Sequence, residues 1–335
     1  MSITDPLPSL LVLLLAAAFS AGITWFSLPL LQRYALARPN ARSSHRIPTP
    51  QGAGIAVIAA TLLVAGACAG LMHLAIPFVT FAAALFIALV GFADDIKSIP
   101  VLPRLLLQAA AVGAVVFAAP ADLRIVPACP LPIERGLLLI AGLWFVNLVN
   151  FMDGLDLMTV AEVVPIAGAM ILLGWLGEFP GPATIVAVAL CGAMLGFAPF
   201  NRPLARVFLG DVGSLPIGLL LGWCLLQLAW HHQLIAALLL PLYYLADATV
   251  TLCHRIARRE PFWAAHRTHF YQRATDSGFT VRRVVGEVFA LNIVLAGLAI
   301  TSIRAGSAPA GIAAGLAGAL AVALQLWRFS RKPAS

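Results

Sequence analysis

The sequence predicts an all-α polytopic integral membrane protein, and three observations support this fold class. Of the 335 residues, 61% are hydrophobic and only 10% are charged, whereas soluble domains contain about 25% charged residues. The hydrophobic residues gather in runs close to the ~20 residues that a membrane-spanning helix needs. Lysine and arginine fall between these runs with a strong bias to alternate loops. A water-soluble globular protein is therefore excluded.

Eleven apolar runs are long enough to be spanning helices. The N-terminal run is interpreted as a retained helix, because no Lys or Arg precedes it and it is longer than the apolar core of a secretory signal. We expect one transmembrane domain over residues 1–335, a bundle of about eleven helices with ten as the alternative count. The predicted spans are 7–30, 53–74, 77–93, 102–119, 136–151, 158–177, 182–200, 213–230, 233–252, 283–303 and 309–329.

The positive charges indicate how the bundle is oriented. Of the 21 Lys and Arg residues, 18 fall in one alternate set of loops, and only Arg124, Arg135 and Arg304 fall in the other. The positive-inside rule makes the richer set cytoplasmic, which places the N-terminus outside and the C-terminus in the cytoplasm. The net charge of +7 is accordingly interpreted as a matter of orientation and anionic lipid, and no nucleic-acid partner is expected.

Acidic residues gather at the predicted cytoplasmic helix ends, where a carboxylate is costly to bury unless it is paired or binds a cation. The third span ends in Asp94 and Asp95, followed by Lys97. Neighbouring side chains on a helix point about 100° apart, so we expect the two acids to have different roles. The alternative is an ordinary solvated helix end with Lys97 as the partner.

A second polar motif ends the fifth span. Asn147, Asn150, Asp153 and Asp156 recur at a spacing of three, which places them in one stripe on a helix that continues past Asn150. Gly154 is expected to end that helix. Carboxylate and amide oxygens suit a hard divalent cation such as Mg²⁺. The alternative, a capped helix end with amide bonds between helices, explains one Asn more easily than four polar residues in register.

The third motif leads into the eighth span. Asp211 follows Phe208 and lies between Gly210 and Gly213, near a predicted helix N-terminus whose free N–H groups favour anions. A helix N-cap alone would also explain this aspartate. Together with the second motif, a metal ion that holds a phosphate is the better interpretation.

The fourth motif lies in the longest cytoplasmic loop and is rich in cations. His266 and His269 lack the cysteine or third nearby histidine that a zinc site needs. With Arg267 and Arg273 they suit phosphate oxygens, to which arginine offers two parallel hydrogen bonds. The alternative is a basic loop that faces lipid.

Two single residues, one in the first loop and one in the ninth span, are weaker indications of function. Arg46 lies in the first cytoplasmic loop, just before the Pro-Thr-Pro sequence at 48–50. Asp247 lies in the otherwise apolar ninth span and is expected to pair with Arg255 or with a cation of the loop.

In this order and on these helix ends, the four motifs resemble the polyprenyl-phosphate N-acetylhexosamine-1-phosphate transferase family, glycosyltransferase family 4. The resemblance covers roughly residues 42–273, and the His-Arg-Thr-His sequence is most similar to bacterial enzymes that initiate O-antigen synthesis. It implies an enzyme of the bacterial inner membrane with its active site facing the cytoplasm. The loops implied in the active site are about 31–51, 94–104, 151–157, 201–212 and 253–283.

The resemblance also implies roles for individual residues. Asp94 and Asp95 correspond to the catalytic acidic pair, and Asp211 with Asn150 or Asp153 would hold Mg²⁺, for which Mn²⁺ could substitute. Asp156 would face the uracil edge and Phe208 would stack on that ring. The residues implied in binding the remaining parts of the substrates are Arg46, His266, Arg267, His269 and Arg273.

The reaction that the resemblance implies transfers N-acetylhexosamine-1-phosphate from a UDP-sugar to undecaprenyl phosphate, giving UMP and a polyprenyl-diphospho-sugar. The expected partners are UDP-N-acetylhexosamine, undecaprenyl phosphate and membrane lipid; a homodimer is left open. Direct attack by the lipid phosphate and a covalent aspartyl-phosphate route both remain open, as does the identity of the sugar.

The competing hypothesis is a secondary transporter for an organophosphate or a proton-coupled solute. Transporters bind their substrates near the bilayer midplane on broken helices, often in related halves. Here the acids crowd one predicted surface and no half-repeat is visible, which favours the transferase.

Overall fold

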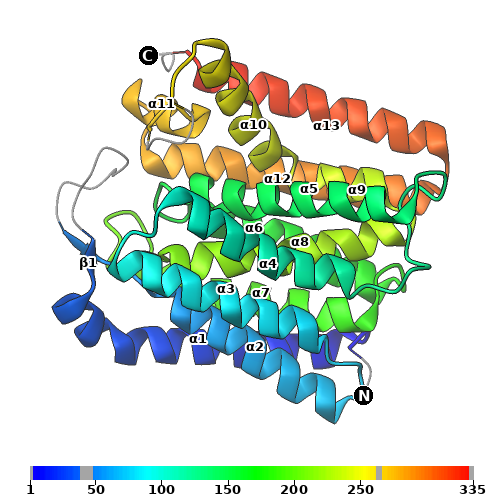
Figure 1. Cartoon of the computed structure of the whole chain (residues 1–335), viewed down its shortest axis with the longest axis horizontal. Helices are drawn as coiled ribbons and strands as arrows, with labels where there is room; N and C mark the ends of the chain where they lie inside the picture. Colours follow the sequence, from blue (N-terminus) through cyan, green and yellow to red (C-terminus); the bar gives the residue numbers. More distant parts are fainter. Residues whose placement is uncertain (1–2, 38–47, 262–265, 332–335) are drawn as a thin grey trace.

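The chain folds into a bundle of long helices that lie roughly side by side (Figure 1). A computed structural model describes residues 3–37, 48–261 and 266–331. Helix α1 begins at one end of the bundle and α13 finishes at the other (Figure 1). The helices are α1 (Pro6–Tyr34), α2 (Gly54–Leu71), α3 (Phe78–Ile96), α4 (Val101–Phe117), α5 (Leu131–Met152), α6 (Met158–Trp175), α7 (Gly181–Phe197), the 3-10 turn η1 (Ala198–Phe200), α8 (Asp211–Trp230), α9 (Leu234–Leu239), α10 (Leu242–Ala257), α11 (Phe270–Asp276), α12 (Val281–Ala305) and α13 (Ala308–Phe329).

Nine helices in the described part of the chain are long and apolar enough to cross a membrane, which makes this a multi-pass, all-α membrane protein. They are α1, α2, α3, α5, α6, α7, α8, α12 and α13. Helix α4 is apolar but shorter, at 17 residues. Ten of the predicted spans therefore each correspond to one helix.

The prediction of one continuous helix over 233–252 is wrong. The segment forms two helices, α9 and α10, which are separated at Leu240 and Pro241. Proline has no backbone N–H, and its ring clashes with the carbonyl four residues earlier, so a helix breaks there. Helix α10 departs from the direction of the long helices. Helix α11 lies at the end of the bundle where α13 finishes (Figure 1).

The core of the bundle is formed by α6, α7 and α8. Within their apolar stretches 78%, 83% and 83% of the residues are buried, against 33% in α1 and 28% in α13. The outer helices turn large apolar side chains outward, as Phe26 and Leu316 do. An apolar exterior is expected where lipid is the surrounding solvent.

Two glycines bring neighbouring helices into backbone contact with the start of α8. A side chain at Gly54 of α2 would overlap the backbone of Gly213, and one at Gly91 of α3 would overlap the carbonyl of Asp211. Only residues without a Cβ permit helices to approach so closely. These contacts fix the first turn of α8 against α2 and α3.

A very short sheet joins the first loop to the start of α8, an addition to the all-helical architecture expected from the sequence. Strands β1 (Leu36–Ala37) and β2 (Thr49–Pro50) are antiparallel. The chain then reaches Phe208, whose N–H donates to the Pro50 carbonyl at 2.8 Å and whose carbonyl accepts the Gly52 N–H at 3.1 Å. The segment before α2 is thereby tied to the segment before α8.

Candidate active site

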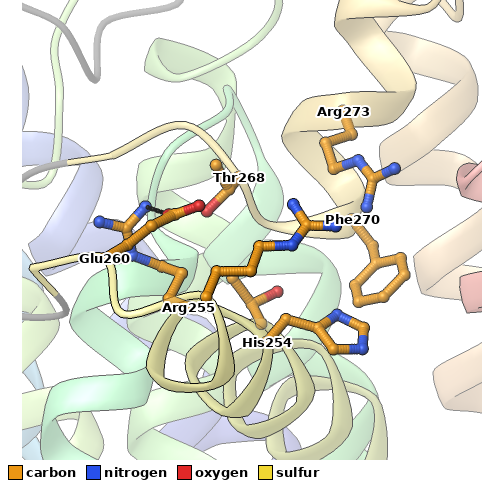
Figure 2. Close-up of a pocket in the computed structure, with 8 residues that line it drawn as sticks. His254, Arg255, Glu260, Thr268, Phe270 and Arg273 are labelled. Carbon is orange, nitrogen blue, oxygen red and sulfur yellow. Dashed lines mark ion pairs between the residues drawn. The ribbon is translucent and has the colours of Figure 1, made fainter.

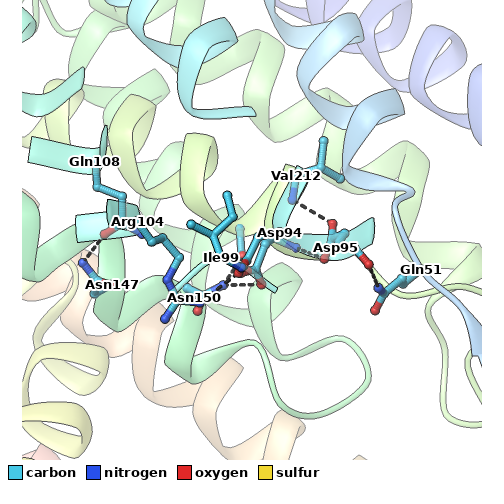
Figure 3. Close-up of polar contacts among 11 residues, drawn as sticks. Gln51, Asp94, Asp95, Ile99, Arg104, Gln108, Asn147, Asn150 and Val212 are labelled. Carbon is cyan, nitrogen blue, oxygen red and sulfur yellow. Dashed lines mark hydrogen bonds and ion pairs between the residues drawn. The ribbon is translucent and has the colours of Figure 1, made fainter. Parts of the chain in front are cut away.

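Asp95 acts as the cap of a helix that lies more than 100 residues later in the chain. One carboxylate oxygen accepts the Asp211 N–H at 3.0 Å and the other accepts the Val212 N–H at 3.1 Å (Figure 3). The first turn of a helix has free N–H groups, and an acidic side chain there satisfies them and complements the helix dipole. Gln51 adds a bond from its side-chain amide to the Asp95 carbonyl at 3.1 Å. Asp95 therefore joins the ends of α3 and α8.

Asp94 has different partners, as the 100° separation predicts. Its Oδ2 forms an ion pair with Arg104 of α4 at 2.8 Å, and its Oδ1 accepts the Ile99 N–H at 2.5 Å (Figure 3). The carboxyl group also lies within hydrogen-bonding distance of the Asp211 carboxyl. Two carboxylates in such contact repel each other unless a proton or a cation lies between them.

Asn150 lies on the other side of Asp211. Its side-chain nitrogen donates to Asp211 Oδ1 at 2.8 Å and to Ser214 Oγ at 2.8 Å. Because the nitrogen makes both bonds, the carbonyl oxygen of the same amide could bind a cation. The stripe predicted on α5 divides at this point, since Asn147 instead donates to Gln108 of α4 at 2.7 Å and serves packing between helices (Figure 3).

Asp153 follows the end of α5 and is partly buried. The Thr159 hydroxyl donates to its Oδ1. Loss of solvent raises the pKa of Asp153 to about 6, and the nearby charges of Asp95 and Asp156 add to this effect, while the Thr159 bond opposes it. A carboxyl group in this position takes up a proton more readily than a free aspartic acid does, and a bound cation would favour its charged form.

Asp156 and Phe208 lie in contacts that shape loops. Asp156 is 6% exposed, and its Oδ2 accepts the Ala205 N–H at 3.2 Å. Phe208 is partly buried beside the first loop. Their roles at the uracil ring stay predictions, and so does the role of Arg46, which lies outside the described residues.

The cationic motif is held by Asp247, a residue fully buried in α10. Its carboxylate accepts the N–H groups of Phe270 and Tyr271, at 3.0 and 3.1 Å, and lies 3.2 Å from His269 Nδ1. The predicted partner Arg255 instead pairs with Glu260 at 2.8 Å. The expectation that Asp247 pairs with a cation of the loop thus applies to His269, with the first turn of α11 as an additional partner.

The other residues of the motif point in several directions. The His266 ring stacks on the His269 ring with centroids 4.9 Å apart. Arg267 forms an exposed ion pair with Asp276 at 2.8 Å. Arg273 lies over the Phe270 ring at 5.6 Å and faces α10 across a separate small cavity.

Tyr271 connects α11 to the acidic residues. Its hydroxyl donates to the Phe151 carbonyl at 3.0 Å, close to the end of α5. A side chain at Gly154 would overlap that hydroxyl, so α11 packs directly against the turn that carries Asp153. The acidic helix ends and the cationic motif therefore meet at one end of the bundle.

Comparison with known proteins shows what this chain is similar to. A sequence profile described as glycosyl transferase family 4 matches residues 77–229, the stretch that holds all the acidic residues from Asp94 to Asp211. Over this stretch, a little under half of its length, the chain is similar to glycosyl transferase family 4. The profile ends before α10 and α11.

The individual proteins to which the chain is similar include two groups. Phospho-N-acetylmuramoyl-pentapeptide-transferase of Granulibacter bethesdensis is 32% identical over 47% of this chain and 48% of that protein, and its Bartonella quintana counterpart is 29% identical over similar shares. Decaprenyl-phosphate N-acetylglucosaminephosphotransferase of Mycolicibacterium smegmatis is 28% identical over 84% of this chain and 79% of that protein. The chain thus spans about half the length of the two muramoyl-pentapeptide transferases and most of the length of the Mycolicibacterium smegmatis protein.

The oxygen groups at these helix ends fit a hard divalent cation. In the described ranges no group of three or more His, Cys, Asp or Glu side chains is gathered as metal ligands. Asp94 and Asp211 nevertheless lie in contact, with the Asn150 amide beside Asp211, and Arg104 balances part of the Asp94 charge. Carboxylate and amide oxygens are the ligands that Mg²⁺ and Mn²⁺ take. Asp153, the third predicted ligand, is near enough to feel the charge of Asp95.

Several residues of the candidate site were not singled out from the sequence. Ser214 lies one helical turn after Asp211, and that spacing could have revealed it. Arg104, Thr159 and Asn201 carry no comparable signal. Asn201 accepts the Leu157 N–H at 2.7 Å and donates to the Val207 carbonyl at 3.0 Å, which holds the loop that leads to Phe208.

Proposed function

We propose that the protein transfers N-acetylhexosamine-1-phosphate from a UDP-sugar to undecaprenyl or another polyprenyl phosphate, releasing UMP and leaving a polyprenyl-diphospho-sugar. The observation that supports this most is the meeting of Asp94, Asn150 and Asp211, from three helix ends, beside a cationic motif. The name of the mycobacterial relative, decaprenyl-phosphate N-acetylglucosaminephosphotransferase, supports the two substrate classes. We further propose that the product starts an O-antigen or another cell-envelope polysaccharide.

The chemical problem in this reaction is the approach of two anions. A phosphate monoester has its second pKa near 6 and is largely dianionic at neutral pH, so the attacking lipid phosphate needs no strong base. Its oxygen forms a bond to the phosphorus that carries the sugar, and the bond from that phosphorus to the UMP oxygen breaks. Asp94, Asp211 and Asn150 would hold Mg²⁺ or Mn²⁺, which supplies charge neutralisation when bound.

The remaining residues would bind and orient. Arg267 brings positive charge to the same end of the bundle, His266 and His269 would offer ring nitrogens to the phosphates, and Asp247 fixes the His269 ring through Nδ1. Asp95 uses both of its oxygens on the N–H groups of α8. This supports direct attack over a covalent intermediate on Asp95, and it supports a role for Asp95 in positioning Asp211.

We propose that the protein lies in the bacterial inner membrane with this site facing the cytoplasm, where UDP-sugars are made available. The one-sided distribution of 18 of the 21 Lys and Arg residues supports the orientation. The position of the acids at helix ends, rather than in mid-helix, is unlike the midplane site expected of a transporter.

The proposal is tested with purified protein in detergent, undecaprenyl phosphate, Mg²⁺ and a panel of UDP-N-acetylhexosamines. We expect UMP release with one or a few sugars, abolition by EDTA, and recovery with added Mg²⁺. Asp211→Asn keeps the size of the side chain but removes its charge, and we expect at least about a hundredfold loss of rate. Asp122→Asn, in an outer loop, is the matched control. UMP release that survives EDTA and Asp211→Asn would contradict the metal assignment.

A further inference from the structure

A small cavity lies between the C-terminal half of α10 and the beginning of α11 (Figure 2). Its volume is about 90 Å³. This is space for a few water molecules or one phosphate group, and it is well below the roughly 300–1,000 Å³ of pockets that hold whole organic ligands. Three arginines and one glutamate line it, with a histidine, a phenylalanine and two threonines.

The charges of this cavity are only partly balanced. Arg255 is paired with Glu260 at 2.8 Å. Arg258 and Arg273 also line the cavity, and neither forms an ion pair within the described ranges; Arg273 instead lies over the Phe270 ring. Two guanidinium groups therefore face a small space without a carboxylate of their own. Such a space favours an anion.

A buried donor gives an independent indication of a ligand. The side chain of Arg255 is only 9% exposed, and its Nε has no hydrogen-bond partner among the described residues. A buried donor without an acceptor costs about 1–3 kcal/mol, and more when the group is charged. The oxygen of a bound anion would remove this cost.

The cavity is separate from the acidic residues. Tyr271 and Gln272 are the α11 residues that meet Gly154 at the end of α5. Phe270 and Arg273, one turn apart on the same helix, line the cavity together with α10. One side of α11 therefore contacts the end of α5, and a different side lines the cavity.

The nature of the surroundings points to lipid as the source of the anion. Ile256 lies beside the cavity arginines on α10, with 52% of its surface exposed. An amphipathic helix with exposed apolar and basic side chains is typical of the boundary between lipid headgroups and acyl chains. Leu252 and Cys253 of the same helix are likewise not fully buried.

We propose that this cavity binds the phosphate of an anionic phospholipid headgroup, at a site distinct from that of the two proposed substrates. Arg258 and Arg273 supply the charge, and Arg255 offers its Nε–H, which has no acceptor among the described residues. The bound lipid braces α10 against α11, the two helices that position His269.

The test measures lipid binding to the full chain without nucleotide or polyprenyl phosphate, so that its result is independent of the proposed reaction. Native mass spectrometry counts phosphatidylglycerol or phosphatidylcholine retained by the protein during lipid titration. We expect the unaltered protein to prefer phosphatidylglycerol, and Arg258→Gln to bind it about fivefold more weakly. Arg258→Lys should restore part of the binding.

Arg282→Gln is the matched control, because Arg282 is an exposed arginine at the start of α12 and its loss changes the net charge equally. Equal weakening by Arg258→Gln and Arg282→Gln would overturn the proposal, since the arginines would then act only as general surface charge. A second arm adds inorganic phosphate to protein in phosphatidylcholine nanodiscs. Arg258-dependent binding of phosphate there, with no preference for phosphatidylglycerol, would overturn the assignment to lipid.

Discussion

Asp95 and Asp247 do the same work in two different regions, each accepting N–H groups from the first turn of a helix elsewhere in the chain. Asp95 receives two backbone donors from α8 and lies among helices in backbone contact. Asp247 receives two backbone donors from α11, and Tyr243, Thr251 and His269 also contact it. Neither the acidic nor the cationic half of the site is therefore held by its own segment. Each half depends on a carboxylate from another helix.

The two regions differ in what a carboxylate holds in place. Asp95 positions Asp211, which we propose as a ligand of the cation, whereas Asp247 positions a motif that we propose to bind substrate. Loss of Asp95 should therefore affect the chemical step, and loss of Asp247 should affect mainly substrate binding.

The largest effect is expected from Asp95→Ala. Two N–H groups of α8 lose their acceptor, which costs about 1–3 kcal/mol each when the groups stay unsatisfied, and Asp211 moves. We expect a loss of kcat for UMP release of about a hundredfold or more, with a lower Tm in detergent. Asp95→Asn keeps one acceptor oxygen and should lie between the two. Equal kcat in Asp95→Ala and the unaltered protein would show that the cap does not position Asp211.

Asp247→Ala should raise KM for the UDP-sugar more than it changes kcat. The first turn of α11 and the His269 ring lose their common acceptor, so the cationic motif is no longer fixed. Steady-state kinetics with varied UDP-sugar should show KM raised about tenfold, the equivalent of about 1.4 kcal/mol. Asp122→Asn is the control, since it removes an exposed carboxylate that lies outside α10 and α11. A change confined to kcat would contradict this division of roles.

Gly54→Ala tests whether the acidic half depends on close packing. A methyl group at this position overlaps Gly213, and overpacking of this kind typically costs about 1–3 kcal/mol. We expect a lower Tm and a several-fold loss of rate. Gly168→Ala in α6 introduces the same methyl group where nothing lies within 4 Å, and it should raise or preserve the Tm. The same Tm for both variants would mean that α2 and α8 can separate without cost.

The smallest effect is expected from Tyr271→Phe, which removes the 3.0 Å hydrogen bond to the Phe151 carbonyl while keeping the ring. The net value of such a bond is about 1 kcal/mol, so KM for the UDP-sugar should rise only a few-fold. Tyr34→Phe, on an exposed tyrosine of α1, should change nothing. An effect as large as that of Asp247→Ala would place the main anchor of α11 at α5 instead of α10.

The sequence predicted that Asp94 and Asp211 lie near Asn150 or Asp153, because all of them stand at the ends of apolar runs. Topology brings alternate helix ends to one side of a membrane, so position along the chain was enough to group them. The individual contacts could not be predicted. Whether Asp94 or Asp95 caps α8 depends on the rotation of α3 against α8, which is set by the contact of Gly91 with Asp211.

The wrong prediction over 233–252 has a simple cause. Mean hydropathy over the whole segment is high enough for a spanning helix, and this outweighed the single break at Pro241. Polar residues from Asp247 to Arg255 then look like exceptions in an apolar helix, although in the structure they form the side of α10 that holds α11. The signal available in the sequence was Pro241, followed six residues later by Asp247 within an apolar run.

The contact of α2 and α3 with the first turn of α8 has a consequence for how such an enzyme could diversify. Where main chains touch, no side chain is left to exchange, and even one added carbon would push the helices apart. The backbone contact of α2 and α3 with α8 is therefore expected to be the same in variants that accept different sugars. New preferences would have to arise elsewhere, in the stretch after α7 and in α11, where side chains can be exchanged.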